Sequence, residues 1–219
     1  MATGEGLTRA QDYTARLERA RDGLKLVLIP VGLLFVVLTF VYMARLGLIP
    51  LGDSGAPAVR GWGHVRLPNG LLAVNTLVLL LSSICMEALR RSSRRSSALG
   101  QLETIPGVTL GKEKRPPWLA ATVVLGLLFL GLQYQAWRIL AARGFYIATN
   151  PISTFTYLLT ATHAAHLAGG ILGLLWLALP LWRKRDAERR SIRIEMLAWY
   201  WHFMALLWVY VLALLEWGA

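Results

Sequence analysis

Long apolar runs separated by shorter polar segments dominate the hydrophobic pattern along this chain. A membrane helix needs about 20 apolar residues, and five runs reach that length without a charge near the middle. They occupy residues 24–45, 69–90, 117–140, 152–182 and 194–217. The pattern therefore predicts an all-α membrane protein with five transmembrane helices. It divides the chain into a polar N-terminal segment, 1–23, and a transmembrane domain, 24–219.

Composition supports this reading and limits the function. Of the 219 residues 56% are hydrophobic and 16% are charged, whereas soluble domains have about 25% charged residues. The five spans use about half of the chain, so there is no room for a soluble catalytic domain. The single cysteine, Cys85, excludes an internal disulfide and any site built from several cysteines.

Basic residues are distributed unevenly between the two ends of the predicted spans. The segments 1–25, 90–115 and 183–193 hold eighteen lysines and arginines, whereas the two loops on the opposite side hold five. Cytoplasmic loops collect such residues, so we expect a cytoplasmic N-terminus and an external C-terminus. The same asymmetry accounts for the net charge of +11, and we expect no nucleic-acid partner.

Histidines offer the only ligand chemistry in the apolar runs. His163 and His166 are three residues apart on one predicted helix, and His202 lies in an aromatic stretch of the last helix. His166 is expected about 24 Å from the cytoplasmic end of its helix and His202 about 12 Å from that of its own. Because of this mismatch in depth, and because no carboxylate lies nearby, we predict no metal site, no cofactor and no catalytic residue in this chain.

Small and polar residues mark the faces on which the predicted helices would pack. Span 152–182 carries a small-residue stripe at intervals of four, and span 69–90 carries Asn75, Thr76, Ser82 and Ser83. The stripe consists of Ala161, Ala165, Gly169 and Gly173. We predict that the stripe meets another helix, either of this chain or of a partner.

Short motifs along the chain resemble subunit III of the haem-copper oxygen reductases, the cytochrome c oxidases and their quinol-oxidising relatives. They occur in the family's order from about residue 24 to 217 and match its short, five-helix bacterial form. The motifs are Asn75-Thr76, Ser82-Ser83, Leu125 to Gln133, Asn150-Pro151, Thr162-His163, His166-Leu167, Trp199 to Phe203, and Trp208.

The resemblance implies a non-catalytic accessory subunit of a terminal oxidase in the bacterial inner membrane. The family's subunit III packs beside catalytic subunit I, binds phospholipid in a cleft between two helix groups, and supports oxygen reduction coupled to proton translocation. Haem and copper are then expected in the catalytic partner, with subunit II and a larger respiratory supercomplex as further partners. The structural or lipid-contact candidates are then Asn75, Thr76, Ser82, Ser83, His163, His166, Trp201, His202 and Trp208.

Three positions depart from the family pattern. Buried acids of the family align with Val31, Ala136 and Ala205, none of which can carry a proton. Intramembrane proton exchange needs such a carboxylate, so we expect no proton relay through this chain. The departure also leaves open a divergent relative, the subunit-III-like protein associated with nitric oxide reductases.

Two functions of other classes compete with the accessory-subunit hypothesis. A small membrane carrier would place ionisable residues and broken helices at mid-membrane, where this chain offers only Asn75, histidines and hydroxyls. A stand-alone haem or metal enzyme is disfavoured by the depth of the histidines.

Overall fold

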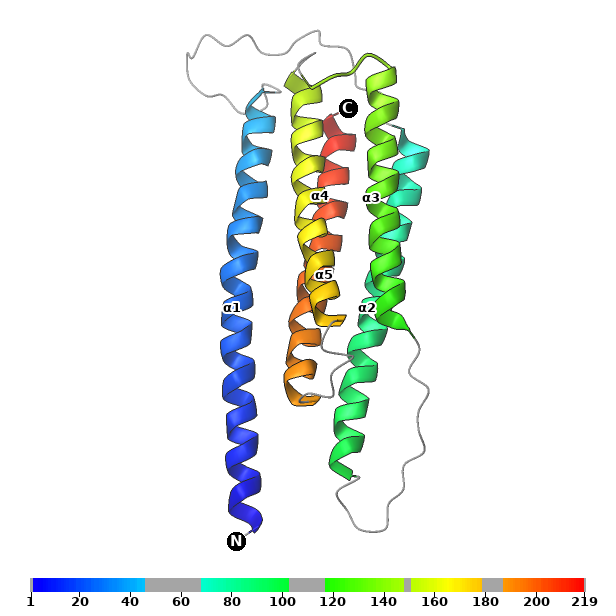
Figure 1. Ribbon diagram of the computed structural model, residues 1–219. Coiled ribbons are helices and arrows are strands. Elements are labelled where there is room, and N and C mark those ends of the chain that lie inside the picture. The colour runs from blue at the N-terminus through cyan, green and yellow to red at the C-terminus, as the bar shows by residue number, and fades with distance from the viewer. Residues whose placement is uncertain (1, 46–67, 103–116, 148–150, 179–186, 219) are drawn as a thin grey trace.

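The computed structural model describes residues 2–45, 68–102, 117–147, 151–178 and 187–218. Within these ranges the chain forms five helices: α1 (Ala2–Arg45), α2 (Asn69–Leu102), α3 (Trp118–Ala142), α4 (Pro151–Ala178) and α5 (Ala187–Gly218). Each helix is long and apolar enough to cross a membrane. The predicted class, an all-α protein with five membrane-spanning helices, is confirmed. Successive helices run in opposite directions, so the two termini lie at opposite ends of the bundle (Figure 1).

The helices extend beyond several of the predicted span limits. α1 continues through the 23/24 boundary without a break, and α2 runs 12 residues past the predicted end at Arg90. α5 begins at Ala187 rather than at 194. Polar helical turns outside the bilayer carry no apolar signal, so hydropathy could not locate these ends. The predicted end of the fourth span, 182, lies outside the described residues.

Two helix ends show why the chain turns where it does. α3 starts after Pro117, whose fixed φ suits the residue just before a helix. It ends at Ala142, and two residues later Gly144 turns the chain: Gly144 has φ of 83°, and its N–H bonds the carbonyl of Ala141 at 2.9 Å. The N–H of Phe145 bonds the carbonyl of Leu140, so the last turn closes with its carbonyls satisfied.

α5 is the central helix of the bundle. It packs on α1, α2 and α4, while α3 packs on α2 and α4, and α1 reaches only α4 and α5 among the described helices. The largest fully buried side chains belong to α5, Trp201 and Trp208. Apolar side chains on the outer faces are exposed, as on α1 with Leu26, Ile29 and Leu33, which is the surface expected of helices that face lipid.

Glycines allow α5 to approach its neighbours closely. A Cβ on Gly126 of α3 would lie 3.1 Å from the ring of Trp201, and a Cβ on Gly170 of α4 would lie 2.8 Å from the ring of Tyr200. Small residues at such points let large aromatic rings pack against a backbone. The close contacts therefore place the two aromatic rings of α5 directly on α3 and α4.

Candidate functional site

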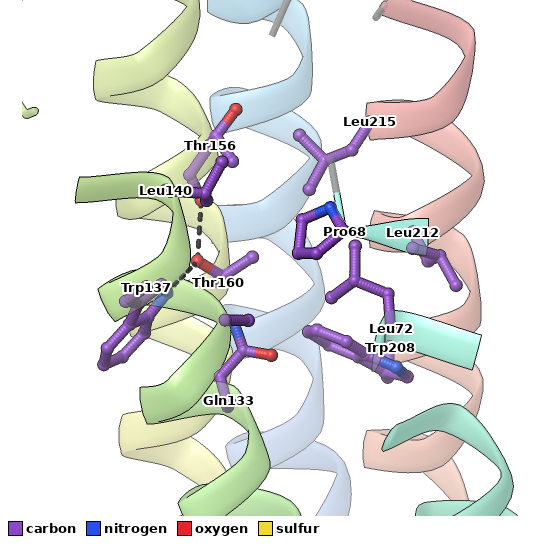
Figure 2. Close-up of a pocket in the computed structure, with 11 residues that line it drawn as sticks. Pro68, Leu72, Gln133, Trp137, Leu140, Thr156, Thr160, Trp208, Leu212 and Leu215 are labelled. Carbon is purple, nitrogen blue, oxygen red and sulfur yellow. Dashed lines mark hydrogen bonds between the residues drawn. The ribbon is translucent and has the colours of Figure 1, made fainter. Parts of the chain in front are cut away.

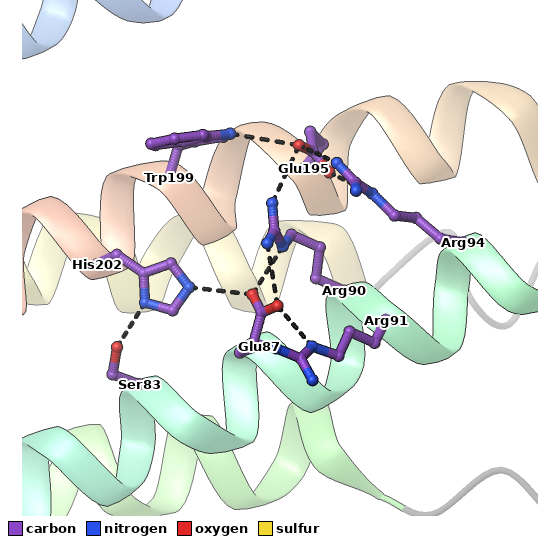
Figure 3. Close-up of polar contacts among 8 residues, drawn as sticks. All are labelled: Ser83, Glu87, Arg90, Arg91, Arg94, Glu195, Trp199 and His202. Atoms are coloured by element: carbon purple, nitrogen blue, oxygen red, sulfur yellow. Dashed lines mark hydrogen bonds and ion pairs between the residues drawn. The ribbon is translucent and has the colours of Figure 1, made fainter.

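A cluster of charged side chains joins α2 and α5 near the ends of their membrane-spanning segments, Asn69–Arg95 and Arg190–Trp217 (Figure 3). Arg90 donates two hydrogen bonds to Glu87, at 2.7 and 3.0 Å, and a third to Glu195 at 3.3 Å. Arg91 adds a 2.8 Å bond to Glu87. Arg90 therefore connects carboxylates on two helices, and such charge-assisted bonds are stronger than neutral ones.

Glu195 is the most buried carboxylate of this cluster, with only 8% of its side chain exposed. Arg94 of α2 donates to both carboxylate oxygens, at 3.1 and 2.6 Å, and the indole of Trp199 donates at 3.3 Å. A buried charge is costly unless paired and hydrogen-bonded. Here the pairing partners come from the other helix, so the charges hold α2 against α5.

His202 extends this cluster toward the membrane interior. Its Nδ1 lies 2.5 Å from the hydroxyl of Ser83, and its Nε2 lies 3.4 Å from a carboxylate oxygen of Glu87. Both ring nitrogens thus face side chains of α2, as Figure 3 shows. His202 acts in the α2–α5 contact, together with Ser83 from the predicted polar face.

Indole N–H groups form a second set of contacts between helices, deeper in the bundle. Trp201 donates to Ser82 at 3.2 Å, and Ser82 in turn donates to the carbonyl of Thr122 at 3.0 Å. Trp208 donates to Thr76 at 3.0 Å. These bonds connect α5 to α2, and through Ser82 they reach α3, so polar residues predicted from the sequence join the central helices.

Asn75 and Gln133 add a buried amide pair. The Asn75 side-chain N–H₂ donates to the Gln133 side-chain oxygen at 3.1 Å, and both residues are almost completely buried. The pair joins α2 to α3. Amide groups in a bilayer are costly when unpaired, so this bond favours one register of the two helices.

The three predicted histidines occupy three separate environments. His163 is fully buried, with ring centroids 5.7 Å from Phe129 and 5.1 Å from Trp208. Nδ1 of His166 lies 2.7 Å from the carbonyl of Thr162. Within the described residues no three His, Cys, Asp or Glu side chains lie close enough together to hold a metal ion.

A small cavity lies between the start of α2 and helices α3, α4 and α5 (Figure 2). Its volume is about 10 Å³, which is about the space that one water molecule needs. Gln133, Thr160 and Trp208 border it, together with apolar side chains and Ala136. Ala136 is one of the positions where the resemblance leads us to expect a family acid. Val31 and Ala205, the other two, are also buried, so all three face the bundle interior with apolar side chains.

The small-residue stripe of α4 mostly faces outward. Ala161, Ala165 and Gly169 are exposed, and a Cβ on Gly169 would meet no atom within 4 Å. Its other glycine, Gly173, does face a described helix, because a Cβ there would lie 3.1 Å from Leu197 of α5. The close approach between α4 and α5 occurs instead at Gly170, one residue from the predicted stripe. Packing of the stripe on a partner remains a prediction.

The charged cluster was not predicted from the sequence, in which Glu87 and Glu195 simply lie near the ends of two predicted spans. One signal was present: Glu87 precedes Arg90 and Arg91 by three and four residues, the spacing at which side chains on a helix meet. Glu195 lies close to the predicted start of the fifth span, but only the fold places it beside Arg94.

The helices and contacts described above define a multi-pass membrane protein whose polar side chains join its helices. No family model matches the chain. It is 28% identical over 158 residues to subunit 3 of the cytochrome bo(3) ubiquinol oxidase of Pseudomonas aeruginosa, covering 72% of this chain and 67% of that protein.

Two cytochrome c oxidase subunits 3 are similar over shorter stretches or at lower identity. The Bacillus sp. protein is 30% identical over 104 residues, which cover 45% of this chain and 48% of the relative. The Corynebacterium diphtheriae protein is 24% identical over 149 residues, which cover 68% and 65%. The matched regions thus span from 48% to 67% of these relatives' own lengths. The chain is therefore similar in sequence to subunit III of quinol oxidases and cytochrome c oxidases.

Proposed function

We propose that this chain is the accessory subunit III of a terminal oxidase in the bacterial inner membrane, and that it stabilises the catalytic subunit. The main observation behind the proposal is that polar side chains of the motifs bond one helix of this chain to another. Thr76, Ser82, Trp201 and Trp208 make hydrogen bonds between the chain's own helices. Side chains used in this way fix a rigid bundle and do not present a reactive group to a substrate.

The expected complex contains catalytic subunit I and subunit II, with the haem and copper in the catalytic subunit. The relatives named above are subunits 3 of a ubiquinol oxidase and of cytochrome c oxidases, which supports an oxidase complex as the partner. A larger respiratory supercomplex is a further part of the proposal. Exposed apolar side chains on α1 to α4 provide surface for the partner subunit and for phospholipid.

The chain is a poor candidate for a proton path. Intramembrane proton transfer needs ionisable groups at depth, and the positions that match the family's acids hold Val31, Ala136 and Ala205, all buried. The carboxylates Glu87 and Glu195 are paired with arginines near the helix ends. We therefore propose a stabilising role without participation in proton uptake.

Purification of the chain from its native membrane in mild detergent tests the proposal. Every accompanying polypeptide is identified, and a reduced-minus-oxidised difference spectrum is recorded. A haem-containing subunit I and oxygen consumption are expected in the same fraction. A preparation that contains the intact chain with no haem protein would contradict the proposal, and a nitric oxide reductase in the fraction would identify the other complex.

A further inference from the structure

The outward face of α3 differs from the outward faces of its neighbours. Every exposed position over residues 26–41 of α1, 70–84 of α2 and 158–175 of α4 carries an apolar side chain or is glycine. Lipid tails solvate such surfaces well. On α3 the exposed positions include Gln135 and Arg138. Among these four helices, α3 alone thus presents polar side chains outward within its membrane-spanning part.

Gln135 lies inside the hydrocarbon layer. α3 has 25 residues and ends at Ala142, seven residues after Gln135, which is about 10 Å along the helix axis. A hydrocarbon core about 30 Å thick, centred on a helix about 37 Å long, begins about 4 Å from that end. Arg138 lies nearer the end and can extend its long side chain to the headgroups. Gln135 is therefore the side chain of this face that lipid solvates poorly.

The amide of Gln135 makes no hydrogen bond within the part of the chain that the structure describes. Gln133, two residues earlier, faces inward instead and accepts a 3.1 Å hydrogen bond from Asn75 of α2. An amide without a partner in hydrocarbon is costly. The cost at Gln135 is removed if another protein supplies the hydrogen bond, as α2 does for Gln133.

Gln135 belongs to a regular seam of exposed positions. They follow one another at intervals of four and three residues, the spacing at which one helix packs along another. The seam consists of Val124, Leu128, Gly131, Gln135 and Arg138. Its middle is open, because a Cβ on Gly131 would meet no atom within 4 Å. A second helix can therefore approach α3 closely at Gly131, about one turn from the amide.

We propose that this seam of α3 docks a membrane-spanning helix of a partner subunit, and that a hydroxyl, amide or carboxyl side chain of that helix hydrogen-bonds Gln135. Small residues and polar side chains together are what joins helices in a bilayer. A second copy of this chain fits the seam less well, because a two-fold pair of parallel helices would bring two Arg138 side chains together. The inference rests on the proposed function, which supplies a complex of several subunits.

Photo-cross-linking in the purified complex identifies what touches the seam. A photo-reactive phenylalanine analogue is placed at Leu128, and at Leu77 as the matched control, since Leu77 is exposed on the apolar face of α2. We expect the probe at 128 to link a peptide from a membrane-spanning helix of another subunit, at higher yield than the probe at 77. Links from 128 to lipid alone, or to a second copy of this chain, would overturn the proposal.

Gln135→Leu separates an amide that meets a protein from one that meets lipid. The proposal predicts that the dissociation constant of the cross-linked subunit rises about three- to tenfold, because one interhelical hydrogen bond is lost. A seam covered by lipid predicts no loss, since leucine suits lipid better than glutamine does.

Gly131→Leu should reduce recovery of the same subunit, while the separated chain unfolds at an unchanged temperature because nothing described lies near that Cβ. Ala73→Leu, at an exposed small residue of α2, is the matched control and should retain the subunit. Unchanged retention in both Gln135→Leu and Gly131→Leu would overturn the proposal. The haem spectrum of the complex, which decides the proposed function, is a separate measurement, so each proposal can fail without the other.

Discussion

Glu195 of α5 and Arg94 of α2, 101 positions apart in the sequence, form a two-bond ion pair at 3.1 and 2.6 Å. Arg90 bonds the same carboxylate and also Glu87 (Figure 3). The carboxylates of Glu87 and Glu195 are thus paired with three arginines, the third being Arg91, which bonds Glu87. The arrangement satisfies each carboxylate and fixes the α2–α5 register near the membrane boundary.

Arg90→Met should destabilise the bundle, because Glu195 would lose one cation and Glu87 its two-bond partner. Breaking a fully buried pair costs about 3–5 kcal/mol, and the partial exposure of Arg90 reduces the expected loss to roughly 1–3 kcal/mol. The measurement is the unfolding free energy in mixed micelles of mild detergent and dodecyl sulfate. Arg95→Met, at an exposed position, serves as the control and should change little. Equal effects of the two variants would show that the cluster contributes no stability.

Gly169 and Gly170 provide a pair of neighbouring substitutions with different expected effects. Gly170→Leu should cost about 1–3 kcal/mol by overpacking, because a Cβ there already meets the Tyr200 ring. Gly169→Leu should leave the stability of the separated chain within about 0.5 kcal/mol, because nothing described lies near it. Both are measured by thermal unfolding of the chain in detergent.

The same pair tests the predicted role of the small-residue stripe. If Ala161, Ala165 and Gly169 face a partner helix, Gly169→Leu should reduce co-purification of that partner although the separated chain remains stable. Unchanged recovery of every partner would contradict the predicted contact between the stripe and a partner helix.

The charge distribution predicts that the N-terminus and residues 92–115 are cytoplasmic. Cysteines are introduced as Ser93→Cys and as Gly55→Cys, each in a chain with Cys85→Ala. In intact cells a membrane-impermeant thiol reagent should modify only the cysteine at 55, and permeabilised cells should show both. Labelling at 93 alone in intact cells would reverse the topology.

Hydropathy predicted the membrane spans because a bilayer requires about 20 apolar residues for each crossing. It could not predict the polar extensions of α1 before Thr14 or of α2 after Arg95, where no apolar run is present. Polar residues such as Ser82 and Thr76 were recognised as a shared face, but periodicity does not reveal which neighbour that face meets. The bonds to Trp201 and Trp208 follow from the position of α5.

The neighbours of the small-residue stripe and of the charged cluster could not be predicted for the same reason. Spacing of four places Ala161, Ala165 and Gly169 on one face of α4, yet α5 lies on the face that contains Gly170. Glu195 meets Arg94 only because α2 and α5 are adjacent. Such contacts depend on the packing of separate helices, which a single sequence does not specify.

The stabilising role is tested most directly by turnover-dependent inactivation of the oxidase complex with and without this chain. Oxygen consumption is followed over successive turnovers, and the initial number of protons moved per electron is recorded in the same vesicles. We expect complexes that lack the chain to start with the same proton stoichiometry and then to lose activity faster or shed subunits. An immediate fall in proton stoichiometry, in a complex that stays intact and durable, would contradict the stabilising role and show that the chain takes part in proton transfer.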